Sequence, residues 1–278
     1  MSVRIVTDSS SDIPSSLAAE LGITIVPATV RFGEEAFLDG VEIDHDTFYR
    51  RLQEERVFPT TSQASPGQFA ETYERLAPGA DAIVSIHLSS LLSGMFNSAV
   101  MGAKASTAAC PVEVVDSRST SLGLGLIAIE AARLARTGAS PETLLAAVRG
   151  WMARSHFCVG LGTLDFLAKG GRIGRAKHLL GTLIRIRPVL GVVEGVVQPL
   201  RQLRTRAQVE AFLDEEARRH QPVQALGVVY STDRGDAEAL AERLSDLCPR
   251  ESIVLGRVGP GLGSHTGPGL LGLALVQQ

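Results

Sequence analysis

The first half of the chain alternates short runs of apolar, β-branched residues with segments of helical periodicity. Three such pairs cover residues 3–22, 81–106 and 112–138, and they begin with VRIVTD, DAIVSIHLS and VEVVDS. Apolar strands that each lead into a helix are typical of a parallel sheet covered on both faces. We therefore predict an N-terminal parallel α/β domain over residues 1–150, with a crevice at the carboxyl ends of its strands.

The pattern changes after about residue 150. Apolar runs are now separated by turns and by two amphipathic helical segments, and they lie at 157–171, 187–203, 223–232 and 251–259. Within VVEGVVQ, Glu194 and Gly195 stand between two valine pairs, which predicts a tight hairpin. We predict a second, α+β domain with a mixed or antiparallel sheet over residues 151–278.

Composition and charge describe an ordinary globular protein. The chain has 278 residues, 45% of them hydrophobic, and a formal net charge of -3. The slight acidity and an aromatic content of only 5% argue against nucleic-acid binding. The three cysteines are far apart and lack metal-ligand spacing, so they indicate neither a disulfide framework nor a metal site.

The distribution of polar and apolar residues along the chain indicates where in the cell the protein is located. The start, MSVRIVTDSS, lacks the apolar core of a signal peptide, and the apolar runs are shorter than a bilayer span. We expect a cytoplasmic protein without stable membrane insertion.

Hydroxyl-rich segments follow the predicted strands. They are VTDSSSD at 6–12, FPTTSQASPGQF at 58–69, HLSSLLSGMFNSA at 87–99 and VVDSRSTSLGLG at 114–125. At a junction between strand and helix, hydroxyl groups and free backbone N–H groups can bind an anion. A helix cap is the simpler interpretation of the first segment. Convergence of several segments would instead form a site for one acidic group.

Two further segments carry charge or unusual backbone. LAKGGRIGR places Arg172 beside a glycine pair, and a guanidinium held there could bind a carboxylate or phosphate, or simply be solvated. GPGLGSHTGPG at 259–269 carries His265 among densely spaced glycines, which are costly unless the backbone needs positive φ or a close approach. This segment is either a floppy loop or part of a site.

Taken in order, these motifs resemble those of the DegV family of fatty acid-binding proteins. The motifs are TDSSSD, TTSQASP, SSLLSGMFNSA, DS at 116–117, KGGRIG, RPVL and HTGPG. They run from residue 3 to about residue 275, and several ordered motifs are a stronger signal than one glycine-rich loop. The chain differs from the frequent family pattern in Met95 and Phe96 after LSG, and in Arg187 before Pro188.

The resemblance implies a two-domain α/β carrier that is not itself an enzyme and needs no metal or other cofactor. One long-chain fatty acid would lie in a tunnel, with its carboxylate at a polar mouth between the domains. Thr61 and Ser93 would donate hydroxyl hydrogen bonds to the carboxylate, while Arg172 and His265 would supply positive charge or orient the donors. A separate fatty acid kinase would phosphorylate the presented carboxylate for phospholipid synthesis.

Other functions compete with this one. A phosphohydrolase or phosphosugar-binding enzyme could use Asp8 as nucleophile or base and Arg172 as a phosphate clamp, although the sequence lacks a Walker loop and a clear set of metal carboxylates. A lipid sensor without a kinase partner is a third possibility.

A basic segment offers a place for a partner to dock. QPLRQLRTR at 198–206 carries Arg201, Arg204 and Arg206. Solvated surface is the simpler interpretation of such a segment. We hypothesise that Arg201 and Arg204 contact an acidic face of the kinase.

Overall fold

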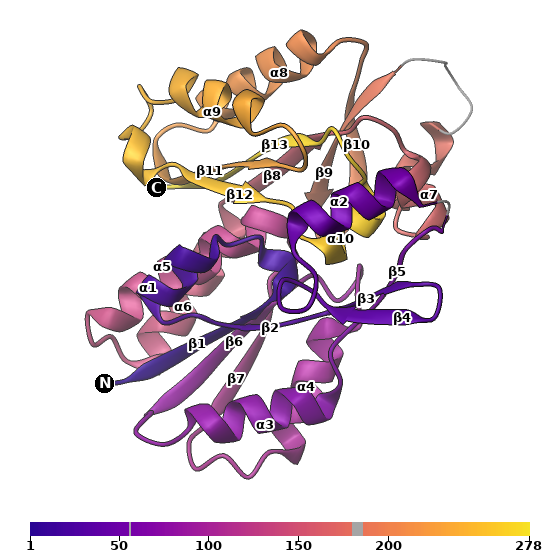
Figure 1. The fold of residues 1–278 in the computed structure, drawn as a ribbon. Coiled ribbons are helices and arrows are strands. Elements are labelled where there is room, and N and C mark those ends of the chain that lie inside the picture. The colour runs from indigo at the N-terminus through magenta and orange to yellow at the C-terminus, as the bar shows by residue number, and fades with distance from the viewer. Residues whose placement is uncertain (56, 180–185) are drawn as a thin grey trace.

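The structure is a computed structural model, and it describes residues 1–55, 57–179 and 186–278. It contains a parallel sheet in the N-terminal part and a larger mixed sheet in the C-terminal part, with helix α5 between them (Figure 1). This arrangement confirms the predicted fold class.

The N-terminal sheet has four parallel strands in the order β2-β1-β6-β7. Its strands are β1 (Val3–Asp8), β2 (Thr24–Val26), β6 (Ala82–His87) and β7 (Val112–Asp116). The helices of this part are α1 (Ser15–Leu21), α3 (Pro66–Leu76), α4 (Met95–Ala105), α5 (Ser121–Arg136) and α6 (Pro141–Ala153). Each predicted strand–helix pair is present.

The sequence pattern did not predict a small antiparallel sheet in this half. Its order is β4-β3-β5, and a further helix precedes β5. The bounds are β3 (Thr29–Phe32), β4 (Glu35–Leu38), α2 (His45–Glu54) and β5 (Thr60–Ser62). Pro27 lies between β2 and β3 and has no N–H to extend the parallel ladder. Gly33, at φ 59°, then turns the chain back into β4.

In the described part of the chain, the C-terminal sheet has six strands in the order β10-β9-β8-β13-β11-β12, and only β11 and β12 pair in parallel. Its strands are β8 (Ser155–Gly160), β9 (Arg187–Val193), β10 (Val196–Leu203), β11 (Val223–Tyr230), β12 (Val254–Arg257) and β13 (Leu271–Gln277). The helices are α7 (Asp165–Lys169), α8 (Arg206–Arg219), α9 (Arg234–Arg243) and α10 (Pro260–Thr266), with α8 and α9 on the outer face of the sheet (Figure 1). Glu194 and Gly195 both have positive φ between β9 and β10, which confirms the predicted hairpin.

One hydrophobic core joins the two halves. It contains Ile86 of β6, Leu126 of α5 and Ala274 of β13, all at most 1% exposed. A Cβ on Gly227 of β11 would lie 2.8 Å from Leu122 Cδ1, so only glycine allows α5 to pack this closely on the second sheet. The boundary predicted at residue 150 falls within α6 and stays a proposal. Among the described residues, no helix is both long and apolar enough to cross a membrane.

Candidate functional site

A cavity of about 1050 Å³, its mouth included, lies between the two halves of the molecule. Much of its wall is apolar, with side chains from both halves, such as Leu88, Met95, Leu161, Leu190, Val197 and Leu270. The four sequence-predicted site residues all line it: Thr61, Ser93, Arg172 and His265. Such a lining suits a ligand of mainly apolar surface with one polar group.

Thr61 and His265 contact each other at the polar end of this cavity. Thr61 lies in strand β5, and its Oγ1 is 2.9 Å from Nε2 of His265. Both residues are half-buried, whereas Arg172 is exposed. The polar end is therefore the end that faces solvent.

His265 lies on a helix, so the segment 259–269 is not the floppy loop that was one of its two interpretations. Residues Pro260–Thr266 form α10, and only the glycines that follow make a turn, with φ 71° at Gly267 and 78° at Gly269. A Cβ on Gly267 would lie 2.3 Å from Cδ2 of Phe166, so glycine lets α7 pack against the end of α10. The glycines thus allow close packing around a rigid helix.

The imidazole of His265 is neutral at pH 7. Burial, together with the nearby charge of Arg172, lowers its pKa from 6.5 to about 4. Of the two roles predicted for this residue, a neutral imidazole favours orientation of a donor over supply of positive charge. Its buried Nδ1 has no hydrogen-bond partner among the described residues.

Arg172 follows the glycine pair and spans to the opposite half of the molecule. Its Nη1 donates to the Gly170 carbonyl at 2.8 Å, and its Nε donates to the Leu92 carbonyl at 3.4 Å. Leu92 immediately precedes Ser93, so the guanidinium contacts the loop that carries the predicted carboxylate donor.

Ser93 stands at the start of α4. Its Oγ accepts a hydrogen bond from the Met95 N–H at 3.2 Å, whereas the N-cap residue, Gly94, has no side chain that could cap the helix. The helix therefore directs its partial positive charge and free N–H groups toward the hydroxyl of Ser93. Met95, one of the departures from the family pattern, lies in the cavity wall at 2% exposure.

Sequence reasoning missed Asp39 and Asp12, two buried carboxyl groups below the start of α10. Asp39 accepts from Gly261 N–H at 3.1 Å, and Asp12 accepts from Gly259 N–H at 2.9 Å and from the Ser121 hydroxyl at 2.5 Å. Burial raises the pKa of Asp39 to about 6 and that of Asp12 to about 8. The sequence signal for Asp12 was its place in TDSSSD. Its partner Gly259 lies 247 residues away, so the sequence pattern could not indicate the contact.

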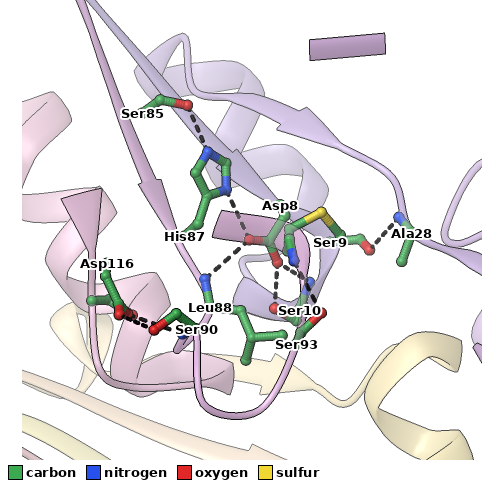
Figure 2. A network of polar contacts seen from close by, with 12 residues as sticks. Asp8, Ser9, Ser10, Ala28, Ser85, His87, Leu88, Ser90, Ser93 and Asp116 are labelled. Carbon is green, nitrogen blue, oxygen red and sulfur yellow. Dashed lines mark hydrogen bonds and ion pairs between the residues drawn. The ribbon is translucent and has the colours of Figure 1, made fainter. Parts of the chain in front are cut away.

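Asp8, the nucleophile or base of the competing enzyme, is fully buried. One carboxylate oxygen accepts from the Ser10 N–H and hydroxyl, and the other contacts His87 Nδ1 at 2.9 Å and Leu88 N–H at 3.1 Å (Figure 2). A carboxylate whose two oxygens are both occupied and unexposed cannot attack a substrate. The enzyme alternative is therefore not supported.

The same network has the composition of a catalytic triad. Ser85 Oγ lies 2.6 Å from His87 Nε2, as Figure 2 shows, and His87 contacts Asp8. However, Ser85 and His87 are 0% exposed, and the Tyr73 hydroxyl lies 2.9 Å from Ser85 Oγ. The serine has no access to a substrate, so the network links strands β1 and β6 to helix α3.

The basic segment lies apart from the cavity. Within the described ranges, neither Arg201 nor Arg204 is among the cavity-lining residues, and both are exposed. The guanidinium of Arg201 lies 5.5 Å from the ring centre of Phe212. Arg206 instead pairs with Glu210 and Asp236.

Known proteins resemble this chain along its whole length. The family model described as "Uncharacterised protein, DegV family" matches residues 2–278. A DegV domain-containing protein of Streptomyces coelicolor is 39% identical over 282 residues, which are 99% of each chain.

Two solved structures have the same fold. The fatty acid-binding DegV family protein of Thermus thermophilus matches with a TM-score of 0.92 and 33% identity, over 100% of both chains. DegV of Bacillus subtilis, described as a fatty acid binding protein, matches with a TM-score of 0.87 and 29% identity, again over 100% of both. The chain belongs to the DegV family.

Proposed function

We propose that this protein binds one long-chain fatty acid in the cavity between its halves. The observation that carries the proposal is the composition of that cavity: a largely apolar wall that also carries Thr61, Ser93, Arg172 and His265. The fatty acid binding described for the relatives from Thermus thermophilus and Bacillus subtilis supports it.

The carboxylate would lie between the hydroxyls of Thr61 and Ser93. Nδ1 of His265 is buried and has no hydrogen-bond partner among the described residues. The tautomer with its hydrogen on Nε2 is therefore favoured, because it leaves a lone pair rather than an N–H group without a partner at Nδ1. Nε2–H then donates to Thr61 Oγ1, and the Thr61 hydroxyl hydrogen is free to donate to the carboxylate. His265 would act by orienting this hydroxyl, while Arg172 contributes charge at the mouth.

The apolar wall would supply most of the affinity. A C16 to C18 chain buries about fifteen methylenes at roughly 0.8 kcal/mol each, a gross contribution near 12 kcal/mol before ordering costs. The polar end would fix the orientation of the chain, because a buried carboxylate needs hydrogen-bond donors.

We also propose that the protein presents this carboxylate to a separate fatty acid kinase and performs no phosphoryl transfer itself. The half-buried hydroxyls and the exposed Arg172 leave the head group accessible at the mouth. Exposed Arg201 and Arg204 would steer an acidic partner, although they lie outside the cavity lining. Reversing both charges would then raise the half-saturating carrier concentration and leave the lipid content unchanged, whereas unchanged kinase kinetics would exclude docking at this patch.

Mass spectrometry of the small molecules released from the purified protein tests the binding function. We expect close to one fatty acid per chain, and only small amounts of phosphosugar or phosphoester. An empty protein that fails to take up added fatty acid would contradict the proposal. A protein that binds fatty acid but whose bound fatty acid is not phosphorylated by any kinase would be a lipid sensor.

A further inference from the structure

A second cavity, here called the rear cavity, lies behind the first. Its volume is about 1150 Å³, its opening to solvent included, and its wall includes Met152, His156, Val193, Leu200 and His220. Three residues line both cavities: Phe157, Gly191 and Val192. These three residues therefore form the partition between the two spaces.

The partition lies where two strands of the sheet diverge. Strands β8 and β9 pair at Gly160–Val189, Val159–Leu190 and Cys158–Gly191, and the ladder then stops. The next rung would be Phe157–Val192, yet both strands continue past it, to Ser155 and Val193. Side chains that oppose each other at a rung lie on the same face of the sheet. No backbone pairing closes the gap between β8 and β9 at this point. The side chains of Phe157 and Val192 therefore close it.

Phe157 is the larger of these two side chains, and glycine flanks it. A Cβ on Gly123 of α5 would lie 2.9 Å from the Cβ of Phe157, and a Cβ on Gly191 would lie 3.1 Å from its carbonyl oxygen. Phe157 is half-buried and lines both cavities, whereas the next residues of β8, Cys158 and Val159, are buried and line one cavity each. Its side chain therefore packs closely on α5 at Gly123.

We propose that Phe157 sets the maximum acyl-chain length of this protein by closing the first cavity against the rear cavity. This inference rests on the proposed fatty acid binding. The occupant of the rear cavity, once the partition is removed, is the methyl end of a longer chain. Met152, Val193 and Leu200 give that end an apolar surface to contact.

The test compares folded wild type with Phe157→Ala, each equilibrated with an equimolar mixture of saturated C14 to C22 fatty acids and analysed by mass spectrometry. We expect Phe157→Ala to move the bound distribution by two or more carbons toward longer chains. Each added methylene that becomes buried increases relative affinity roughly fourfold, the equivalent of about 0.8 kcal/mol. Val192→Ala, a milder change, should move the distribution in the same direction by less.

A filling variant shows whether the gain uses the rear cavity. Ala153 lines only the rear cavity and is exposed, so Ala153→Trp can occupy part of that space at little cost to folding. We expect Ala153→Trp alone to keep the wild-type distribution, and Phe157→Ala with Ala153→Trp to move the distribution back toward that of the wild type.

Two results would overturn the inference while the binding function stands. One is an unchanged length distribution in Phe157→Ala and Val192→Ala. The other is a double variant that keeps the longer chains. Absence of fatty acid from the wild type would instead remove the proposed function and this inference with it.

Discussion

Nε2 of His265 lies 2.9 Å from Oγ1 of Thr61, although 204 residues separate them in the chain. One residue lies on the short helix α10, and the other lies in an edge strand of the small antiparallel sheet. The pair forms the polar end of a largely apolar cavity, and the predictions below depend on it.

Loss of either hydroxyl should weaken fatty acid binding. Thr61→Val keeps the shape of the threonine side chain. We expect Thr61→Val and Ser93→Ala each to reduce the free energy of fatty acid binding by about 1.5 to 3 kcal/mol, because each removes a hydrogen bond to a charged group. Thr61→Ser keeps the hydroxyl and serves as the matched control. Isothermal titration with palmitate measures the effect, and equal affinities for Thr61→Val and Thr61→Ser would exclude the assigned role.

His265 should titrate differently with and without ligand. Its pKa of about 4 means that the imidazole is neutral at pH 7, and a carboxylate bound nearby favours the charged form. We expect the pKa to rise on binding, so binding takes up a proton at mildly acidic pH. Nitrogen-15 NMR of the imidazole measures both the pKa and the tautomer. A pKa that does not rise would place the carboxylate elsewhere.

Asp12 should make the protein less stable as pH rises. Its pKa is about 8 in the folded state and 3.8 without burial, so the unfolded chain ionises first and stability is lost between these two values. The loss is about 1.4 kcal/mol for each pH unit in this window. Denaturant unfolding from pH 4 to 9 checks it. Asp12→Asn keeps the acceptor for Gly259 N–H and should flatten the profile, whereas a profile identical to wild type would refute the assignment.

The two glycines after α10 should differ in their tolerance of alanine. Both have positive φ, which strains a side chain. At Gly267, where φ is 71° and ψ is -173°, the backbone is in a region that is essentially restricted to glycine, and only there would the Cβ also collide with Phe166. No atom lies within 4 Å of the Cβ position at Gly269, so Gly269→Ala is the control. We expect a clearly larger loss of unfolding free energy for Gly267→Ala. Equal losses of unfolding free energy would mean that α7 can move away from the new Cβ at position 267 without an energetic cost.

Sequence patterns could predict the elements whose signal is local. The strand–helix pairs and the hairpin at Glu194 and Gly195 have such signals, in apolar periodicity and turn residues. The antiparallel sheet β4-β3-β5 was not predicted, because its short strands carry little periodicity.

The site was only partly accessible to sequence reasoning. Motif order placed Thr61, Ser93, Arg172 and His265 together, and the cavity does bring them together. The neutral state of His265 could not be predicted, because it arises from burial and from the charge of Arg172. Asp39 and the partition at Phe157 depend on contacts between segments that are distant in sequence.

Carbon-13 NMR of carboxyl-labelled palmitate bound to the protein tests most directly whether the carboxylate lies at Thr61 and Ser93. We predict one bound carboxyl resonance, distinct from that of free palmitate, which shifts in Thr61→Val and in Ser93→Ala. Phe157→Leu, at the partition, should leave it unchanged. A resonance that ignores both hydroxyl variants, or that moves with Phe157→Leu instead, would contradict the assignment of this end of the cavity to the carboxylate.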